Sequence, residues 1–170
     1  DVASAMEGYD GTWGFALYDR HCDHWVNLAP GYTQYSASAG KIISVIAALR
    51  AVEAGRVEMH EIEAPVEAVL THSWDNDADY LESFTTQPDY DEILQIAGTE
   101  TARFSGNWRH ANMGPADMAK IWAALVEGQY LNPGNTQYVM SLAGGSIIPE
   151  EYRTFPDGSF DPPNFSYGQK

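Results

Sequence analysis

The stretch YSASAGKIISVIAALRAVEAG, residues 35–55, places two serines and a lysine at the start of an apolar helical pattern. Over residues 39–54, apolar side chains recur at the i, i+3, i+4 spacing of a helix, and further apolar residues fill the opposite side. A helix that is apolar nearly all round belongs inside a domain. Ser38 is a good N-cap and Gly55 a plausible stop, so we expect a buried helix between them.

Ser38 and Lys41 are three residues apart, so on a helix both side chains lie on one face of the first turn. A serine hydroxyl is a weak nucleophile, and a partly desolvated lysine beside it can take its proton near neutral pH. The N–H groups at a helix N-terminus also favour a developing oxyanion. This pattern predicts Ser38 as the nucleophile and Lys41 as the base, since Ser36 has no lysine one turn away. The motif S-x-x-K is common, however, and its other interpretation is a capping serine beside a solvent-facing lysine.

The composition is that of one folded, acidic domain. The 170 residues are 44% hydrophobic and 19% charged, which is typical of a globular chain, and we treat residues 1–170 as a single domain. The net charge of −15 repels phosphate and anionic lipid, so we expect neither nucleic acid binding nor membrane insertion. The chain starts at Asp1 without a methionine or signal sequence. We therefore expect a secreted or cell-envelope protein whose signal has been removed.

The order of predicted elements indicates an α+β domain. Aromatic and β-branched runs at residues 11–20 and 24–31 flank the turn HCD and predict a β-hairpin. Helical patterns follow, bounded by glycine or proline, and we expect loop from Gly144 onward. The further helices are expected at residues 65–72, with Pro65 in the first turn, and at 90–97, 115–127 and 136–142. This order suggests an antiparallel sheet flanked by helices that is not finished by residue 170.

Two short elements give the chain a resemblance to a known family. SASAGK, residues 36–41, and SWDND, residues 73–77, are similar to the first two elements of serine β-lactamases and penicillin-binding proteins. In that superfamily the nucleophile serine and its lysine open a buried helix, and an S-D-N element faces them. The chain looks most like the compact serine hydrolases of actinobacterial genomes, which are related to class A β-lactamases. The resemblance implies a β-lactamase/transpeptidase-like fold and a serine hydrolase that works through an acyl-enzyme.

The resemblance also implies roles for the second element. Ser73 would relay a proton to the leaving group, Asn76 would bind a substrate amide, and Asp75 would hold the loop. Trp74 departs from the family pattern because it separates Ser73 from the Asp-Asn pair. Either Trp74 is an insertion and Ser73 keeps its role, or the serine has been replaced, and we favour the insertion.

The third family element, K-T-G, carries a lysine on a sheet strand beside the nucleophile. The only candidate here is Lys170 in FSYGQK, for which the resemblance implies substrate binding. Lys170 is the last residue of this chain. We therefore expect the C-terminal sheet strands to be missing, the domain to be incomplete at its C-terminus, and a further segment to complete the sheet.

The deacylating loop of class A β-lactamases, W-E-x-x-L-N, is similar to AGTETARFSGNWRHAN at residues 97–112. Trp108 and Asn112 match its tryptophan and asparagine, but Arg109 stands in the place of the glutamate. A guanidinium cannot act as a general base. We therefore expect poor hydrolysis of β-lactams. Residues 113–125 resemble the helix that follows this loop.

Other motifs do not indicate a metal or a cofactor. HCDH, residues 21–24, offers zinc-type ligands without a second cluster, and DNDAD, residues 75–79, lacks the glycine and glutamate of an EF-hand. The resemblance implies a cofactor-free serine hydrolase that acts outside the cytoplasm on small-molecule or peptidoglycan-like amides or esters. The alternative is a non-catalytic β-lactamase-like module with a binding or structural role, which Trp74, Arg109 and the truncated third element would favour.

Overall fold

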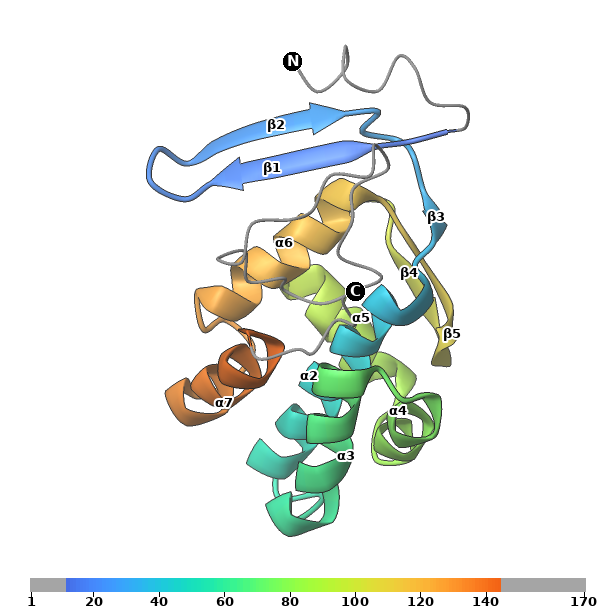
Figure 1. Cartoon of the computed structure of the whole chain (residues 1–170), viewed down its shortest axis with the longest axis vertical. Helices are drawn as coiled ribbons and strands as arrows, with labels where there is room; N and C mark the ends of the chain where they lie inside the picture. The colour runs from blue at the N-terminus through green and yellow to red at the C-terminus, as the bar shows by residue number, and fades with distance from the viewer. Residues whose placement is uncertain (1–11, 145–170) are drawn as a thin grey trace.

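A computed structural model describes residues 12–144, in which helices lie below a long β-hairpin (Figure 1). The fold is α+β, as the sequence predicts, and mostly helical with two small antiparallel sheets. In chain order the elements are β1 (Phe15–Asp19), β2 (His24–Leu28), β3 (Gln34–Tyr35), the 3₁₀ turn η1 (Ala37–Gly40), α2 (Lys41–Glu53), α3 (Met59–His72), α4 (Asp75–Glu82), α5 (Gln87–Ile96), β4 (Arg103–Ser105), β5 (Asn107–Met113), α6 (Pro115–Val126) and α7 (Pro133–Gly144). Within residues 12–144, no helix is both long and apolar enough to cross a membrane. Lys170 and the loop expected beyond Gly144 lie outside the described residues.

The predicted β-hairpin is confirmed by the pairing of β1 with β2. Tyr18 lies opposite Trp25, and their rings stack with centroids 4.4 Å apart. This hairpin packs on α6. The other sheet, in the order β3-β5-β4, joins segments distant in sequence, since Tyr35 pairs with Asn112. It brings the chain just before α2 against β5.

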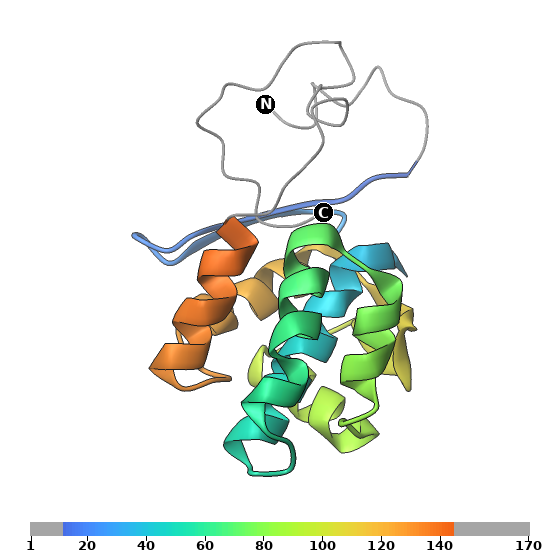
Figure 2. The same cartoon turned by 60° about the horizontal axis from the view of Figure 1, so that its bottom comes forward.

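α2 is the buried centre of the helical part, as its apolar pattern predicts. Every apolar residue from Ile42 to Leu49 is fully buried. α3, α4, α5 and β5 all pack against α2, and Figure 2 shows the helices gathered on one side of the β1–β2 hairpin. Burial of a side chain the size of leucine or isoleucine contributes about 1.5–3 kcal/mol. α2 is therefore firmly packed, and it holds the residues at its start in a fixed position.

The start of this helix differs from the prediction, whereas its end agrees. Ser38 is not the N-cap, because η1 comes first and the α-helix begins at Lys41. The hydrogen bonds that tie Ser36 to β5, described below, hold this part of the chain in a tighter turn than an α-helix. The end is as expected, with Ala54 as the C-cap and Gly55 at a left-handed φ of +69°.

Three predicted helices begin earlier than their apolar patterns indicate. α3 begins six residues before Pro65, which therefore lies in the helix interior and not in the first turn. A capping box between Glu58 and Glu61 starts α3, and glutamate is not among the preferred N-cap residues. α5 also begins with a capping box, at Thr86, and α7 begins at Pro133. α6 matches the prediction to within one residue.

The helix α4 and the β4–β5 hairpin are not indicated by the sequence pattern. α4 is short and polar, and only Ala78 and Leu81 in it are fully buried, so its apolar periodicity is too brief to recognise. Residues 97–112, which resemble a loop in sequence, contain the β4–β5 hairpin. Gly106 makes its turn with a φ of +81°, a conformation that costs glycine little. These two elements border the start of α2.

Candidate active site

The turn that carries Ser38 is clamped against β5. Ser36 donates both its backbone N–H and its hydroxyl to the carbonyl of Ala111, over 3.0 and 3.1 Å. Gly40 lies against the same strand, where a Cβ would stand 2.6 Å from Ser36 Oγ and 3.0 Å from the Cβ of Ala111. The glycine of SASAGK is therefore required by packing, and the hydroxyl of Ser36 is structural.

A strained backbone conformation immediately precedes Ser38. Ala37 has a left-handed φ of +48°, which residues other than glycine rarely adopt unless their surroundings impose it. The hydrogen bonds of Ser36 on one side and the buried α2 on the other impose it here. Enforced conformations of this kind concentrate at functional sites. This one holds the half-buried Ser38 at the start of α2.

Lys41 is a buried cation with three polar contacts. Its side chain is 1% exposed. Nζ donates to the carbonyl oxygen of Ser73 at 2.5 Å, to Ser73 Oγ at 3.3 Å and to the carboxylate of Asp75. A buried charge is tolerated only with partners of this kind. The lysine therefore does not face solvent, and α2 meets the α3–α4 junction at its amine.

The end of α3 turns Ser73 toward this amine. Ser73 is the C-cap, in a left-handed conformation with φ 60° and ψ 36°. This conformation ends the helix and directs the carbonyl and the hydroxyl of Ser73 to Lys41. Trp74 projects into solvent and is 58% exposed. Ser73 thus reaches Lys41 although Trp74 separates it from Asp75.

Asn76 lies on the exposed first turn of α4, beside an open depression of about 400 Å³. Ser73 and Asp75 line the same depression, as do Trp74 and Asp77. The depression therefore reaches two of the groups that contact the lysine amine. An amide on its rim is suitably placed to meet a molecule that enters it.

Three carboxylates along one face of α4 hold the neighbouring elements. Asp75, Asp79 and Glu82 follow the i, i+4, i+7 spacing, and the first of them contacts the lysine amine. Asp79 accepts the indole N–H of Trp108 at 3.1 Å. Glu82 accepts the backbone N–H of Trp108 at 2.7 Å and the hydroxyl of Ser44 at 2.6 Å. α4 is thereby bonded to both β5 and α2.

The indole of Trp108 covers the lysine amine. Trp108 is 5% exposed, and Nζ of Lys41 lies 4.4 Å from the centre of its ring. Arg109 Cζ lies 4.4 Å from the ring as well, and its guanidinium pairs with Asp79. The described β4–β5 segment therefore brings an aromatic face, and no carboxylate, to Lys41.

The pKa values of Asp79 and Glu82 are shifted in opposite directions. The hydrogen bond from Arg109, helped by the indole N–H of Trp108, holds the pKa of Asp79 below its usual range. Burial raises the pKa of Glu82, and the hydrogen bonds from Ser44 and Trp108 offset this only in part. Burial therefore outweighs the hydrogen bonds at Glu82, whereas the hydrogen bonds outweigh burial at Asp79.

The arrangement of these elements is similar to that of several solved structures. A β-lactamase from Sphaerobacter thermophilus matches with a TM-score of 0.74 at 18% identity, over 91% of this chain and 73% of that one. A β-lactamase from Xanthomonas campestris gives 0.75 at 16% identity, over 91% and 72%. A PBP-A variant, solved as an acyl-enzyme complex with penicillin G, gives 0.70 at 15% identity, over 81% and 64%. The chain has the serine β-lactamase fold. No family model and no curated protein matches it in sequence.

The serine β-lactamase fold brings together part of the predicted site. Lys41 and Ser73 are in contact, Ser38 lies one turn before the lysine, and Asn76 lies on the rim of the adjoining depression. Lys170 lies outside the described residues. Identities below one fifth establish the architecture and assign no role to any residue.

Sequence reasoning missed Asp79 and Glu82, although both hold the surroundings of the lysine. The available signal was their spacing with Asp75, which places three acids on one face of a helix. That signal depends on recognising α4, which the apolar pattern does not reveal. Within residues 12–144, no group of three or more His, Cys, Asp or Glu side chains is arranged to hold a metal ion.

Proposed function

We propose that this chain is a serine hydrolase that forms an acyl-enzyme on Ser38, with Lys41 as the base and Ser73 as a proton relay. One observation carries the proposal: the buried Lys41 contacts Ser73, at the end of another helix. Lys41 lies one turn after the strained Ala37, which precedes Ser38. Packing alone does not call for a cation here, because burial of a charge costs free energy that an apolar side chain would not. The serine β-lactamase fold supports the same chemistry.

Acylation begins with attack of Ser38 Oγ on a substrate carbonyl. Lys41, after giving up one proton to solvent, takes the hydroxyl proton as the new C–O bond forms, and the backbone N–H of Ser38 donates to the developing oxyanion. The carboxylate of Asp75 and the carbonyl of Ser73 stabilise the resulting ammonium, because both already accept from Nζ. Collapse of the tetrahedral intermediate breaks the bond to the leaving group and leaves the acyl group on Ser38.

Ser73 is the proposed route by which the proton reaches the leaving group. Its hydroxyl lies 3.3 Å from Lys41 Nζ. The ammonium can pass one proton to Ser73 Oγ while Ser73 gives its own to the departing amine or alkoxide, which leaves Lys41 neutral. In the described structure Nζ makes no hydrogen bond to Ser38 Oγ. Rotation of the Lys41 side chain or a bridging water has to connect Nζ to Ser38 Oγ when substrate binds. Catalytic hydrogen bonds often form fully only in the complex with substrate.

Release of the acyl group is the slow step of this proposal. Hydrolysis requires a base that activates water, but Arg109 is a cation paired with Asp79. A guanidinium cannot supply that base. Trp108, from the same segment, occupies the space beside Lys41. We therefore expect an acyl-enzyme formed from a β-lactam to persist.

The proposed substrates are small-molecule or peptidoglycan-like amides or esters. The proposed location of the protein is outside the cell or in the cell envelope. Asn76 and Lys170 are the proposed substrate-binding residues. The depression beside Ser73 supports the position of Asn76, because a substrate there would lie next to the proposed proton relay. The net charge of −15 argues against nucleic acid and anionic lipid as alternatives.

Labelling with penicillin and with a fluorophosphonate tests this proposal. Peptide mapping should find an adduct on Ser38 of the wild type and none after Ser38→Ala or Lys41→Ala. Ser36→Ala is the matched control, because it removes a hydroxyl from the same turn and keeps the backbone hydrogen bond that ties this turn to Ala111. It should still be labelled on Ser38. If Ser38 remains unmodified in folded protein at high reagent concentration, the enzyme proposal fails.

A non-catalytic β-lactamase-like module is the second candidate. The observation that favours it is the engagement of the Lys41 amine with Ser73 and Asp75, which would also suit a purely structural ion pair. In that case the fold serves a binding or structural role and Ser38 is inert. Complete labelling of Ser38 excludes this candidate, whereas a folded protein without an adduct favours it.

A further inference from the structure

Trp108 is the residue through which β5 reaches Lys41. Its ring centre lies 4.4 Å from Lys41 Nζ, and the side chain is 5% exposed. The indole has no group that could accept the proton of Ser38. Its contact with the proposed base therefore concerns the position and surroundings of the amine.

Two carboxylates of α4 fix the position of this indole. Asp79 accepts the ring N–H at 3.1 Å, and Glu82, one turn further on, accepts the backbone N–H at 2.7 Å. The same oxygen of Glu82 accepts the hydroxyl of Ser44 at 2.6 Å. Because Ser44 lies one turn after Lys41 on α2, these contacts connect back to the helix that carries the lysine. The indole of Trp108 cannot tilt away from the amine without breaking its hydrogen bond to Asp79.

An aromatic face beside an ammonium both attracts it and excludes water. The attraction arises from the negative π face of the ring and grows when the pair is desolvated, as it is here. At the usual strength of such contacts, loss of the ring changes the population of the amine position by roughly 3- to 30-fold. An aliphatic side chain of similar bulk would exclude water without supplying this attraction.

We propose that Trp108 is a positioning residue for Lys41. Its indole holds the amine at the junction of α2, α3 and α4, against Ser73 and Asp75, and screens it from solvent. The inference rests on the proposed serine hydrolase function. On this proposal Asp79 and Glu82 act by fixing Trp108. This explains why the short helix beside the site, α4, is polar.

Trp108→Phe and Trp108→Leu separate the aromatic face from bulk, since both remove the indole N–H and only phenylalanine keeps a ring. We expect the rate constant for acylation of Ser38 at saturating penicillin to fall roughly 3- to 30-fold in Trp108→Leu and to recover largely in Trp108→Phe. The dissociation constant of penicillin should be unchanged in both. Trp25→Leu, in the β1–β2 hairpin, is the matched control and should acylate like the wild type. A wild-type rate in Trp108→Leu, or equal losses in both Trp108 variants, would overturn the proposal.

Ring-current shifts provide a readout that does not depend on catalysis. In protein with ¹³C-labelled lysine, the Cε protons of Lys41 should resonate upfield of those of the other two lysines. The shift should survive in Trp108→Phe and vanish in Trp108→Leu. No adduct on Ser38 with the upfield shift intact would overturn the proposed function and with it the catalytic purpose of the contact. A Lys41 signal at its ordinary position would overturn the present inference alone.

Discussion

The β4–β5 hairpin is held from two sides by different kinds of side chain. On the α4 side the contacts involve charge, because Asp79 and Glu82 accept hydrogen bonds from Trp108, whose ring covers the buried amine of Lys41. The charges are partly withdrawn from solvent, and burial raises the pKa of Glu82. Each of these groups is linked to the proposed base.

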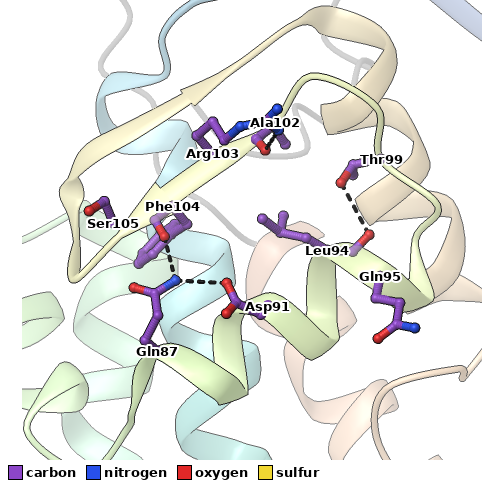
Figure 3. Close-up of a pocket in the computed structure, with 9 residues that line it drawn as sticks. All are labelled: Gln87, Asp91, Leu94, Gln95, Thr99, Ala102, Arg103, Phe104 and Ser105. Carbon is purple, nitrogen blue, oxygen red and sulfur yellow. Dashed lines mark hydrogen bonds between the residues drawn. The ribbon is translucent and has the colours of Figure 1, made fainter.

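On the α5 side a single neutral amide holds the hairpin. Gln87 Nε2 donates to the carbonyl of Phe104 at 2.7 Å and to Asp91 at 2.8 Å, and its oxygen accepts the N–H of Gly106 at 2.9 Å. Figure 3 shows this amide at one end of an open groove of about 400 Å³ between α5 and β4. A neutral amide makes these bonds at any pH at which the protein is folded.

The difference between the two sides shows which contacts serve the fold and which serve the site. One amide is enough to satisfy the backbone of a hairpin turn. Burial of a charged side chain costs more free energy than burial of a neutral amide. Ionisable groups with perturbed pKa values cluster at functional sites. Substitutions on the α4 side should therefore change activity and pH dependence, whereas substitutions on the α5 side should change stability alone.

The largest expected effect is that of Lys41→Met, which removes the charge that Trp108 covers and nearly keeps the shape of the side chain. Acylation of Ser38 should fall roughly 10²- to 10⁴-fold, the usual contribution of a positioned base. The free energy of unfolding in urea should fall by less than about 1 kcal/mol, since apolar residues often replace buried ion pairs without loss. Asp75, at 56% exposed, is not stranded by the change. A marked loss of stability with unchanged acylation would make the lysine structural.

Gln87→Leu should have the opposite character. It removes the bonds to Phe104 and Gly106 and should lower the free energy of unfolding by about 1–2 kcal/mol, while Ser38 acylates at the wild-type rate. Gln95→Leu is the control, because this amide borders the same groove without bonding to the turn (Figure 3). A slower acylation in Gln87→Leu would end the division between the two sides.

Glu82→Gln tests the cost of charge beside the site. Burial raises the folded-state pKa of Glu82 above its ordinary value of 4.5, so its contribution to stability is fully present below pH 4.5 and is lost as pH rises through the raised pKa. The amide keeps an acceptor for Ser44 and Trp108. The variant should therefore have a higher Tm than the wild type at pH 7 and a similar Tm near pH 4. Parallel profiles of Tm against pH would contradict this.

Asp79→Asn should give the smallest effect, with the opposite sign. The hydrogen bond from Arg109 lowers the pKa of Asp79 below 3.8, so its contribution is present above pH 3.8 and is lost as pH falls through the lowered pKa. The variant should have a slightly lower Tm at pH 7, and the difference should disappear in acid. Because Asp79 is 42% exposed, added salt should reduce the difference as well. A difference that grows in acid would show that the charge is not responsible.

The central helix and the first hairpin could be predicted because their signals are local. Residues 39–54 repeat apolar side chains at helical spacing, and the runs around HCD have strand composition. α4 could not be predicted, because two buried residues make too short a pattern. The pairing of Tyr35 with Asn112 was also hidden, since it depends on segments that the whole helical middle separates.

The site could be predicted only as far as its spacing within one element. Lys41 follows Ser38 by three positions, which is one helical turn, and this spacing indicates their chemistry. The contact between Lys41 and Ser73 depends on how α3 ends against α2, which was anticipated from family resemblance and not from pattern. The place of Trp108 over the amine follows from the β4–β5 hairpin, which the sequence pattern did not indicate.

The mass of the Ser38 peptide after incubation with penicillin is the most direct measurement of the central claim. We expect an adduct on Ser38 that forms in the wild type, forms roughly 10²- to 10⁴-fold more slowly in Lys41→Met, and persists after free penicillin is removed because Arg109 cannot act as a base. An unmodified Ser38 in folded protein would contradict the claim, as would an adduct that forms equally fast without the lysine.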